Sequence, residues 1–95
     1  MTRAEKIIER LRRALDTDAI ELVDDSHLHA GHAGARDGRG HFRVRIVSPR
    51  FAGLRTLQRH QLVYSSLGEL MQTDIHALNI AALTPEEEPA EKTAG

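Results

Sequence analysis

Residues 41–47 read HFRVRIV, and apolar and polar side chains alternate through this stretch up to its last two positions. Phe42, Val44 and Ile46 fall on one side of an extended chain, and the histidine and the two arginines fall on the other. A period of two is typical of a strand with one buried face. The stretch therefore predicts a half-buried strand with a basic outer face, which Ser48-Pro49-Arg50 ends.

The residues before this strand predict a helix, a short strand and a long loop. Thr2 and Glu5 form a capping-box pattern, and the apolar residues that follow at helical spacing predict a helix to about Leu15. Residues 20–23 read IELV, which is typical of a short strand. Residues 24–40 contain four glycines and three histidines without an apolar period, and a loop of this length is usually functional or disordered.

The residues after it predict helix and then a last strand. Apolar spacing favours helix from Leu54 to about Gln72, with Gly68 dividing a longer helix from a short one. Residues 76–83 read HALNIAAL and fit either type by pattern, but their shortness and the Thr-Pro that follows favour a strand. His76 shares parity with the apolar residues of that strand, which predicts a half-buried side chain.

The predicted order is helix, strand, strand, helix, helix, strand. Three strands with helices on one face predict a two-layer α+β domain with a three-stranded sheet over residues 1–85. Residues 86–95 are acidic, contain a proline and carry little to bury, so they predict a disordered tail.

Composition excludes several functions. The chain has 95 residues and no cysteine, which removes a disulfide framework, thiol catalysis and thiolate ligation of an iron-sulfur cluster by this chain alone. Aromatic residues make up 3%, so a platform that stacks several bases is disfavoured. The charged, amphipathic N-terminal stretch and the absence of a run of roughly 18 apolar residues predict a cytoplasmic protein that does not cross a membrane.

Charge is distributed unevenly although the net charge is −1. Seven arginines lie between Arg36 and Arg59, against a single acid, Asp37. A basic surface of this kind suits an acidic partner or nucleic acid, and it equally fits a plain solvated face. The candidate contacts are Arg43, Arg45, Arg50, Arg55 and Arg59.

Histidine is the only residue type with an obvious chemical role here. Three of the six histidines lie in the glycine-rich loop as His-x-His-x-x-His, at positions 27, 29 and 32. Neutral imidazole binds iron, zinc and copper, but this spacing matches no zinc-finger pattern, and solvated histidines without a role remain an alternative. His60 lies within a predicted helix, where a structural hydrogen bond is the ordinary explanation. No nucleophile elbow or phosphate-binding loop is present, so we expect a binding protein and not an enzyme.

Several separated motifs resemble one family. They are Phe51-x-Gly53 and, after five intervening residues, Arg59-His60-x-x-Val63, together with Ser26-x-x-His29, His41-Phe42 and His76-Ala77-Leu78. In this order and spacing the chain resembles the BolA family from its first helix to Pro85.

The resemblance implies a fold, a partner and a cofactor. It implies an αββααβ domain similar to the class II KH fold, which agrees with the order predicted above. It also implies a heterodimer with a monothiol glutaredoxin that shares a [2Fe-2S] cluster, with thiolates from the glutaredoxin and glutathione, in iron-sulfur cluster trafficking or iron regulation. Carried across, the ligands are His76 and, from the loop, His29, with His27 and His32 as alternatives. No cluster is expected in the isolated chain, which we expect to be a monomer or a weak homodimer.

A nucleic-acid-binding transcriptional regulator is the rival hypothesis. It would use the five arginines of residues 43–59, with His60 beside Arg59, as phosphate or partner contacts. Gln61 stands where the family often carries arginine, and the Gly-x-x-Gly clamp of nucleic-acid-binding KH domains is missing, so the fold alone does not predict nucleic-acid binding.

Overall fold

The computed structural model describes residues 1–26 and 39–88. Helices and strands follow one another in the predicted order, α1 (Arg3–Leu15), β1 (Ile20–Asp24), β2 (Gly40–Val47), α2 (Thr56–Leu67), α3 (Leu70–Thr73) and β3 (Ile75–Leu83). Short 3-10 turns, η3 (Pro49–Phe51) and η4 (Pro85–Glu87), follow β2 and β3. The two-layer αββααβ architecture with a three-stranded sheet is therefore confirmed.

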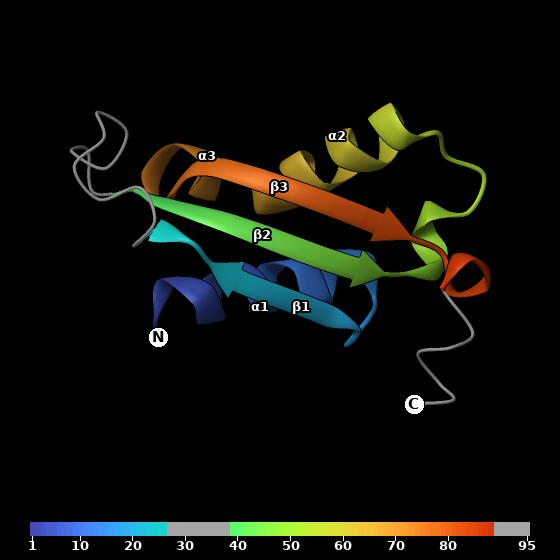
Figure 1. The fold of residues 1–95 in the computed structure, drawn as a ribbon, viewed down its shortest axis with the longest axis horizontal. Coiled ribbons are helices and arrows are strands. Elements are labelled where there is room, and N and C mark those ends of the chain that lie inside the picture. Colours follow the sequence, from blue (N-terminus) through green and yellow to red (C-terminus); the bar gives the residue numbers. More distant parts are fainter. Residues whose placement is uncertain (27–38, 89–95) are drawn as a thin grey trace.

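The sheet has the strand order β1-β2-β3. β1 pairs antiparallel with β2, and β3 pairs parallel with β2, so β3 is an edge strand. All three helices lie on one face of this sheet (Figure 1). We call the other face the open face; its side chains include those of His41, Arg43 and Arg45 on β2.

Local sequence signals explain where the helices begin and end. Thr2 and Glu5 form the predicted capping box of α1, with the Thr2 side chain accepting from the Glu5 backbone at 3.1 Å. Gly68 ends α2 at φ 54°, a left-handed conformation that glycine adopts without the steric cost of a Cβ. The predicted division between a longer and a shorter helix at Gly68 is confirmed.

The core lies between the helices and the inner face of β2. Alternate residues of β2 meet the apolar stripe of α1, and the shorter helices and η3 close the remaining side. Every member is at most 5% exposed: Ile7, Leu11, Leu15, Phe42, Val44, Ile46, Phe51, Val63, Leu67, Leu70 and Ile75. Burial of these side chains, at about 1.5–3 kcal/mol each, supplies the main stabilisation of the fold.

At the predicted domain boundary the chain forms the short turn η4, and Thr84 caps that turn together with Glu87. Glu87 is held because its carboxylate binds Arg59 at 2.5 Å and 3.0 Å and accepts from the Thr84 backbone at 2.9 Å. Residues 89–95 lie outside the described part of the chain.

No helix within the described ranges is both long enough and apolar enough to cross a membrane.

Candidate functional site

His76 lies where β3 begins, and its side chain is exposed. The strand alternation predicted a half-buried side chain, and that prediction was wrong. The cause is a shift in register: Gly40 pairs with Ile75 and His41 pairs with Ala77, so His76 falls between two paired residues. An irregularity of this kind redirects side chains at strand ends. Here it points the imidazole of His76 towards the solvent.

His41, which the sequence analysis did not select as a ligand, lies beside it. The two imidazole centroids are 5.0 Å apart and their planes are inclined by 46°. This separation is that of two aromatic rings in contact. The two imidazoles therefore lie side by side, although they belong to different strands.

Further ligands must come from outside this pair. Within residues 1–26 and 39–88, no three side chains of histidine, aspartate, glutamate or cysteine gather closely enough to hold a metal ion. His27, His29 and His32 lie outside the described residues.

The ends of the segment that carries these three histidines are anchored at the same place. Ser26 Oγ accepts a hydrogen bond from the backbone N–H of His41 at 3.1 Å. At the other end, the Gly40 N–H donates to the Asp74 carbonyl at 2.9 Å. A Cβ on Gly40 would come within 2.6 Å of the Phe42 ring and 2.9 Å of Ser26 Oγ, so this close approach requires glycine. We call this region, with His41, His76 and Arg39, the histidine end of the β2–β3 pair.

Arg39 contacts the exposed ligand candidate directly. Its Nη2 lies 3.3 Å from His76 Nδ1, and its Nη1 donates to the Gln72 carbonyl at 3.4 Å. A guanidinium can only donate, so Nδ1 accepts in this arrangement and a proton on the neutral ring belongs to Nε2. A metal ion that binds Nδ1 must therefore displace Arg39.

Asp74 fixes the backbone just before β3. Its Oδ2 binds Lys6 Nζ at 2.8 Å and Arg3 Nε at 3.3 Å, and Thr73 Oγ1 donates to its Oδ1 at 2.6 Å. Lys6 first, then Thr73 and Arg3, lower the pKa of this carboxyl from 3.8 to about 2, against the opposing effect of burial. The carboxylate thereby ties α1 to the start of β3.

The opposite end of the same strand is held by Arg59 of α2. Its guanidinium donates to the carbonyls of Leu54 at 2.9 Å and Ala82 at 3.1 Å, besides binding Glu87. The hydrogen bond from Arg59 lowers the pKa of Glu87 from 4.5 to about 2, and that from the Thr84 backbone adds to the shift. We call this region the arginine end of β3.

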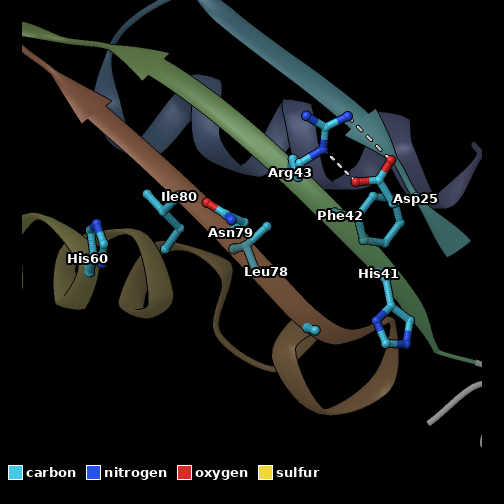
Figure 2. A pocket seen from close by; sticks show the side chains of 9 residues that line it. Asp25, His41, Phe42, Arg43, His60, Leu78, Asn79 and Ile80 are labelled. Carbon is cyan, nitrogen blue, oxygen red and sulfur yellow. Dashed lines mark hydrogen bonds and ion pairs between the residues drawn. The ribbon is translucent and has the colours of Figure 1, made fainter. Parts of the chain in front are cut away.

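The predicted basic surface is largely neutralised by acids of the chain itself. Arg43 binds Asp25 at 2.5 Å, which raises the pKa of Arg43 (Figure 2). Arg45 lies 3.5 Å from Glu88 and 3.9 Å from Glu21. With Arg59 bound to Glu87, three of the five candidate arginines are paired.

Arg50 and Arg55 are the exceptions among the candidates. Both are exposed, and neither forms an ion pair with a residue in the described ranges. His60 is half-buried on α2 and lies across β3 from His41 (Figure 2).

An open groove of about 490 Å³ runs along β3. It joins the histidine end to α2, and Figure 2 shows His41 at one end and His60 at the other. Its lining residues are Asp25, His41, Phe42, Arg43, His60, Ala77, Leu78, Asn79 and Ile80.

Comparison with known proteins assigns the family. The model of the family described as "BolA-like protein" matches residues 11–87. The chain belongs to the BolA-like family. Among curated relatives it is 42% identical over 91 residues to the Arabidopsis thaliana protein named BOLA1, chloroplastic, covering 93% of this chain and 57% of that protein. It is also 42% identical over 83 residues to the Escherichia coli protein named DNA-binding transcriptional regulator BolA, covering 87% and 76%.

Solved structures agree with this assignment. The structure of BolA1 from Arabidopsis thaliana matches with a TM-score of 0.79 at 37% identity, over 94% of this chain and 99% of that one. These relatives carry the names of BolA-like proteins and of a regulator, not of enzymes. The present chain spans little more than half the length of the curated plant relative.

Proposed function

We propose that this chain pairs with a monothiol glutaredoxin and supplies imidazole ligands, His76 and His29, to a [2Fe-2S] cluster that the two proteins share with glutathione. The observation that supports this proposal most is the histidine end. There an exposed His76 lies 5.0 Å, ring to ring, from His41, beside both anchors of the histidine-containing segment.

Chain length is compatible with a ligand from that segment. His29 is three residues from Ser26, whose hydroxyl binds the His41 backbone. Three residues span at most about 11 Å when fully extended. His29 can therefore reach the histidine end, as can His27 and, through a longer path, His32.

Imidazole ligands set the chemistry that the cluster would have. Replacing thiolates by neutral imidazoles on one iron raises the reduction potential of a [2Fe-2S] centre. Imidazole is also protonated near neutral pH, which makes it a labile ligand. Both properties suit a protein of iron-sulfur cluster trafficking or iron regulation better than one that holds a cluster permanently.

The test is to mix the chain with a monothiol glutaredoxin that carries its glutathione-ligated [2Fe-2S] cluster. Visible absorption and circular dichroism report changes of cluster ligand, and size-exclusion chromatography reports the heterodimer. We expect a changed spectrum with the wild type and none with His76→Ala. His29→Ala identifies the ligand of the histidine-rich segment, with His27→Ala and His32→Ala as its alternatives.

Two further variants make the result specific. Ser65→Ala changes an exposed side chain of α2 outside the histidine end and serves as the control. His41→Ala is expected to weaken the change without abolishing it if His41 only positions His76. An unchanged spectrum on mixing the wild type, or a full spectral change with His76→Ala, contradicts the proposal.

A DNA-binding regulator is the second candidate, because the Escherichia coli relative carries that name. The exposed Arg50 and Arg55 are the residues that could contact phosphate without breaking an ion pair in the described part of the fold. Replacing both with glutamine should then reduce the salt dependence of duplex DNA affinity, with a slope change of about 2. DNA binding that survives this change unaltered contradicts a role for these two residues.

The compartment and the state of the free chain belong to the same proposal. We propose the cytoplasm and a monomer or weak homodimer; one relative is named for the chloroplast, so family membership does not fix the compartment.

A further inference from the structure

The two edges of the sheet differ in how well they are protected against pairing with another strand. β1 is five residues long and carries Glu21 and Asp24. β3 is nine residues long and contains no charged residue and no proline. Short length, charge and proline are the usual means of blocking an edge strand, so β1 is blocked and β3 lacks these devices.

The direction of the free backbone groups on β3 follows from two hydrogen bonds. The Leu83 carbonyl accepts from Ser48 N–H at 2.9 Å, so it faces β2. The Ala82 carbonyl accepts from Arg59 at 3.1 Å and faces the opposite side. Backbone groups alternate along a strand, and Leu78 and Ile80 therefore direct their N–H and C=O groups to the free edge. No residue of the described part forms a hydrogen bond with either of them from that side.

α2 forms a floor beside this edge. It lies alongside β3 on the side away from β2, and its His60 lines the groove together with Leu78 and Ile80 (Figures 1 and 2). Leu57 and Tyr64 lie on the same side of the helix, at −3 and +4 from His60, and are 69% and 41% exposed. These two side chains do not line the groove, but they extend the exposed flank of α2 from His60, which does.

We propose that the free edge of β3, backed by α2, is a docking groove for an extended, uncharged segment of a protein partner, which adds to the sheet as a further strand. The edge offers alternating N–H and C=O groups, which match the backbone of a polypeptide and give affinity without a particular sequence. Apolar side chains of that segment would cover Leu57 and Tyr64. The groove reaches the histidine end at His41, but the proposed ligand His76 does not line it.

Charge favours a peptide over a nucleic acid in this groove. The nearest arginines are already bound to acids, Arg43 to Asp25 and Arg59 to Glu87. A polyanion gains its affinity from cations that are available to phosphate. Arg59 also closes one end of the groove, because it occupies the Ala82 carbonyl.

The test uses the isolated full chain, without glutaredoxin or cluster, so its failure leaves the cluster proposal untouched. The probe is an acetylated and amidated seven-residue peptide of alternating valine and threonine. Tyr64 is the only tyrosine and there is no tryptophan, so intrinsic fluorescence reports the floor of the groove alone. Amide resonances of Leu78, Ile80 and Ala82 report the edge. We expect both signals to saturate together.

Two comparisons make the result decisive. Leu57→Glu should weaken binding about tenfold, and Ser65→Glu, which adds the same charge to another exposed position of α2, should change it less than about twofold. N-methylation of the alternate peptide amides that face β3 should abolish binding, because it removes the donors that pair with the strand edge. The absence of a saturable shift at peptide concentrations up to millimolar overturns the proposal. So does a stronger response to a ten-residue oligothymidylate, or a shift that depends on protein concentration alone and indicates a second copy.

Discussion

The two ends of strand β3 are built from similar residue types but do different things. At the histidine end, Arg39 contacts the imidazole of His76, and the ring centroids of His41 and His76 lie 5.0 Å apart with tilted planes. At the arginine end, Arg59 donates hydrogen bonds to two backbone carbonyls and to Glu87. One end carries an exposed imidazole with a single guanidinium contact, and the other holds helix α2 and turn η4 to the sheet.

The difference shows that the environment of an arginine decides its role more than its place in a basic run. Arg59 is only 14% exposed in its side chain and satisfies acceptors from three segments. Binding a phosphate there would break these contacts first. The histidine end is therefore the better candidate for a site that exchanges ligands, and four predictions test this contrast.

The largest expected effect concerns Asp74, which anchors the histidine end. Asp74→Asn should lower the free energy of unfolding at pH 7 by about 2 kcal/mol, since a pKa shift of one unit corresponds to about 1.4 kcal/mol. For a chain of this size that corresponds to a fall in Tm of roughly 8–16 °C. Urea and thermal unfolding measure it, and Asp18→Asn, at an exposed turn, is the control. Equal losses in the two variants would show that Asp74 is no anchor.

The second prediction concerns the pH dependence of stability at both ends. Asp74 and Glu87 have folded pKa values of about 2, below their ordinary values of 3.8 and 4.5. A depressed carboxyl pKa stabilises the fold fully above the unfolded pKa and loses that contribution as the pH falls towards the folded one. The urea midpoint should therefore be level above pH 5 and fall between about pH 4.5 and 2. Asp74→Asn should flatten part of this fall, and a wild-type midpoint that does not change in this range contradicts both shifts.

Much of the fold could be predicted from the sequence because its signals are local. The capping box at Thr2, the alternation in residues 41–47 and the break at Gly68 each operate within a few residues. Register and long-range pairing are different. The exposure of His76 depends on a shift between β2 and β3, which no alternation within one strand can show.

The same reasoning explains what was missed at the candidate site. His41 begins β2 and His76 begins β3, and only the parallel pairing of these strands brings the two rings together. Likewise the basic run around residue 59 appeared free because Glu87, its neutralising acid, is 28 residues away. A prediction that residues 41–47 and 76–83 pair in parallel would have placed His41 beside His76.

The third prediction compares two arginines next to one another in the fold. Arg59→Gln removes hydrogen bonds to Leu54, Ala82 and Glu87, so it should lower Tm by several degrees. Amide protons near Glu87 should also exchange faster with solvent. Arg55→Gln changes an exposed side chain and should stay within about 0.5 kcal/mol of the wild type. Thermal unfolding and hydrogen exchange measure both. A loss of similar size in the two variants would remove the contrast between a structural and an available arginine.

The smallest effect is expected at Arg39. Its guanidinium occupies His76 Nδ1 at 3.3 Å in the free chain, and a metal that binds this nitrogen has to displace it. An exposed hydrogen bond of this type contributes about 0.5–1 kcal/mol. Arg39→Leu should therefore lower Tm by only a few degrees and lower by roughly threefold the chain concentration that gives half of the cluster spectral change. Arg50→Leu, at an exposed arginine outside the histidine end, is the control. If Arg39→Leu instead raises that concentration, Arg39 orients the ring for binding through Nε2, and the competition inferred from the 3.3 Å contact is wrong.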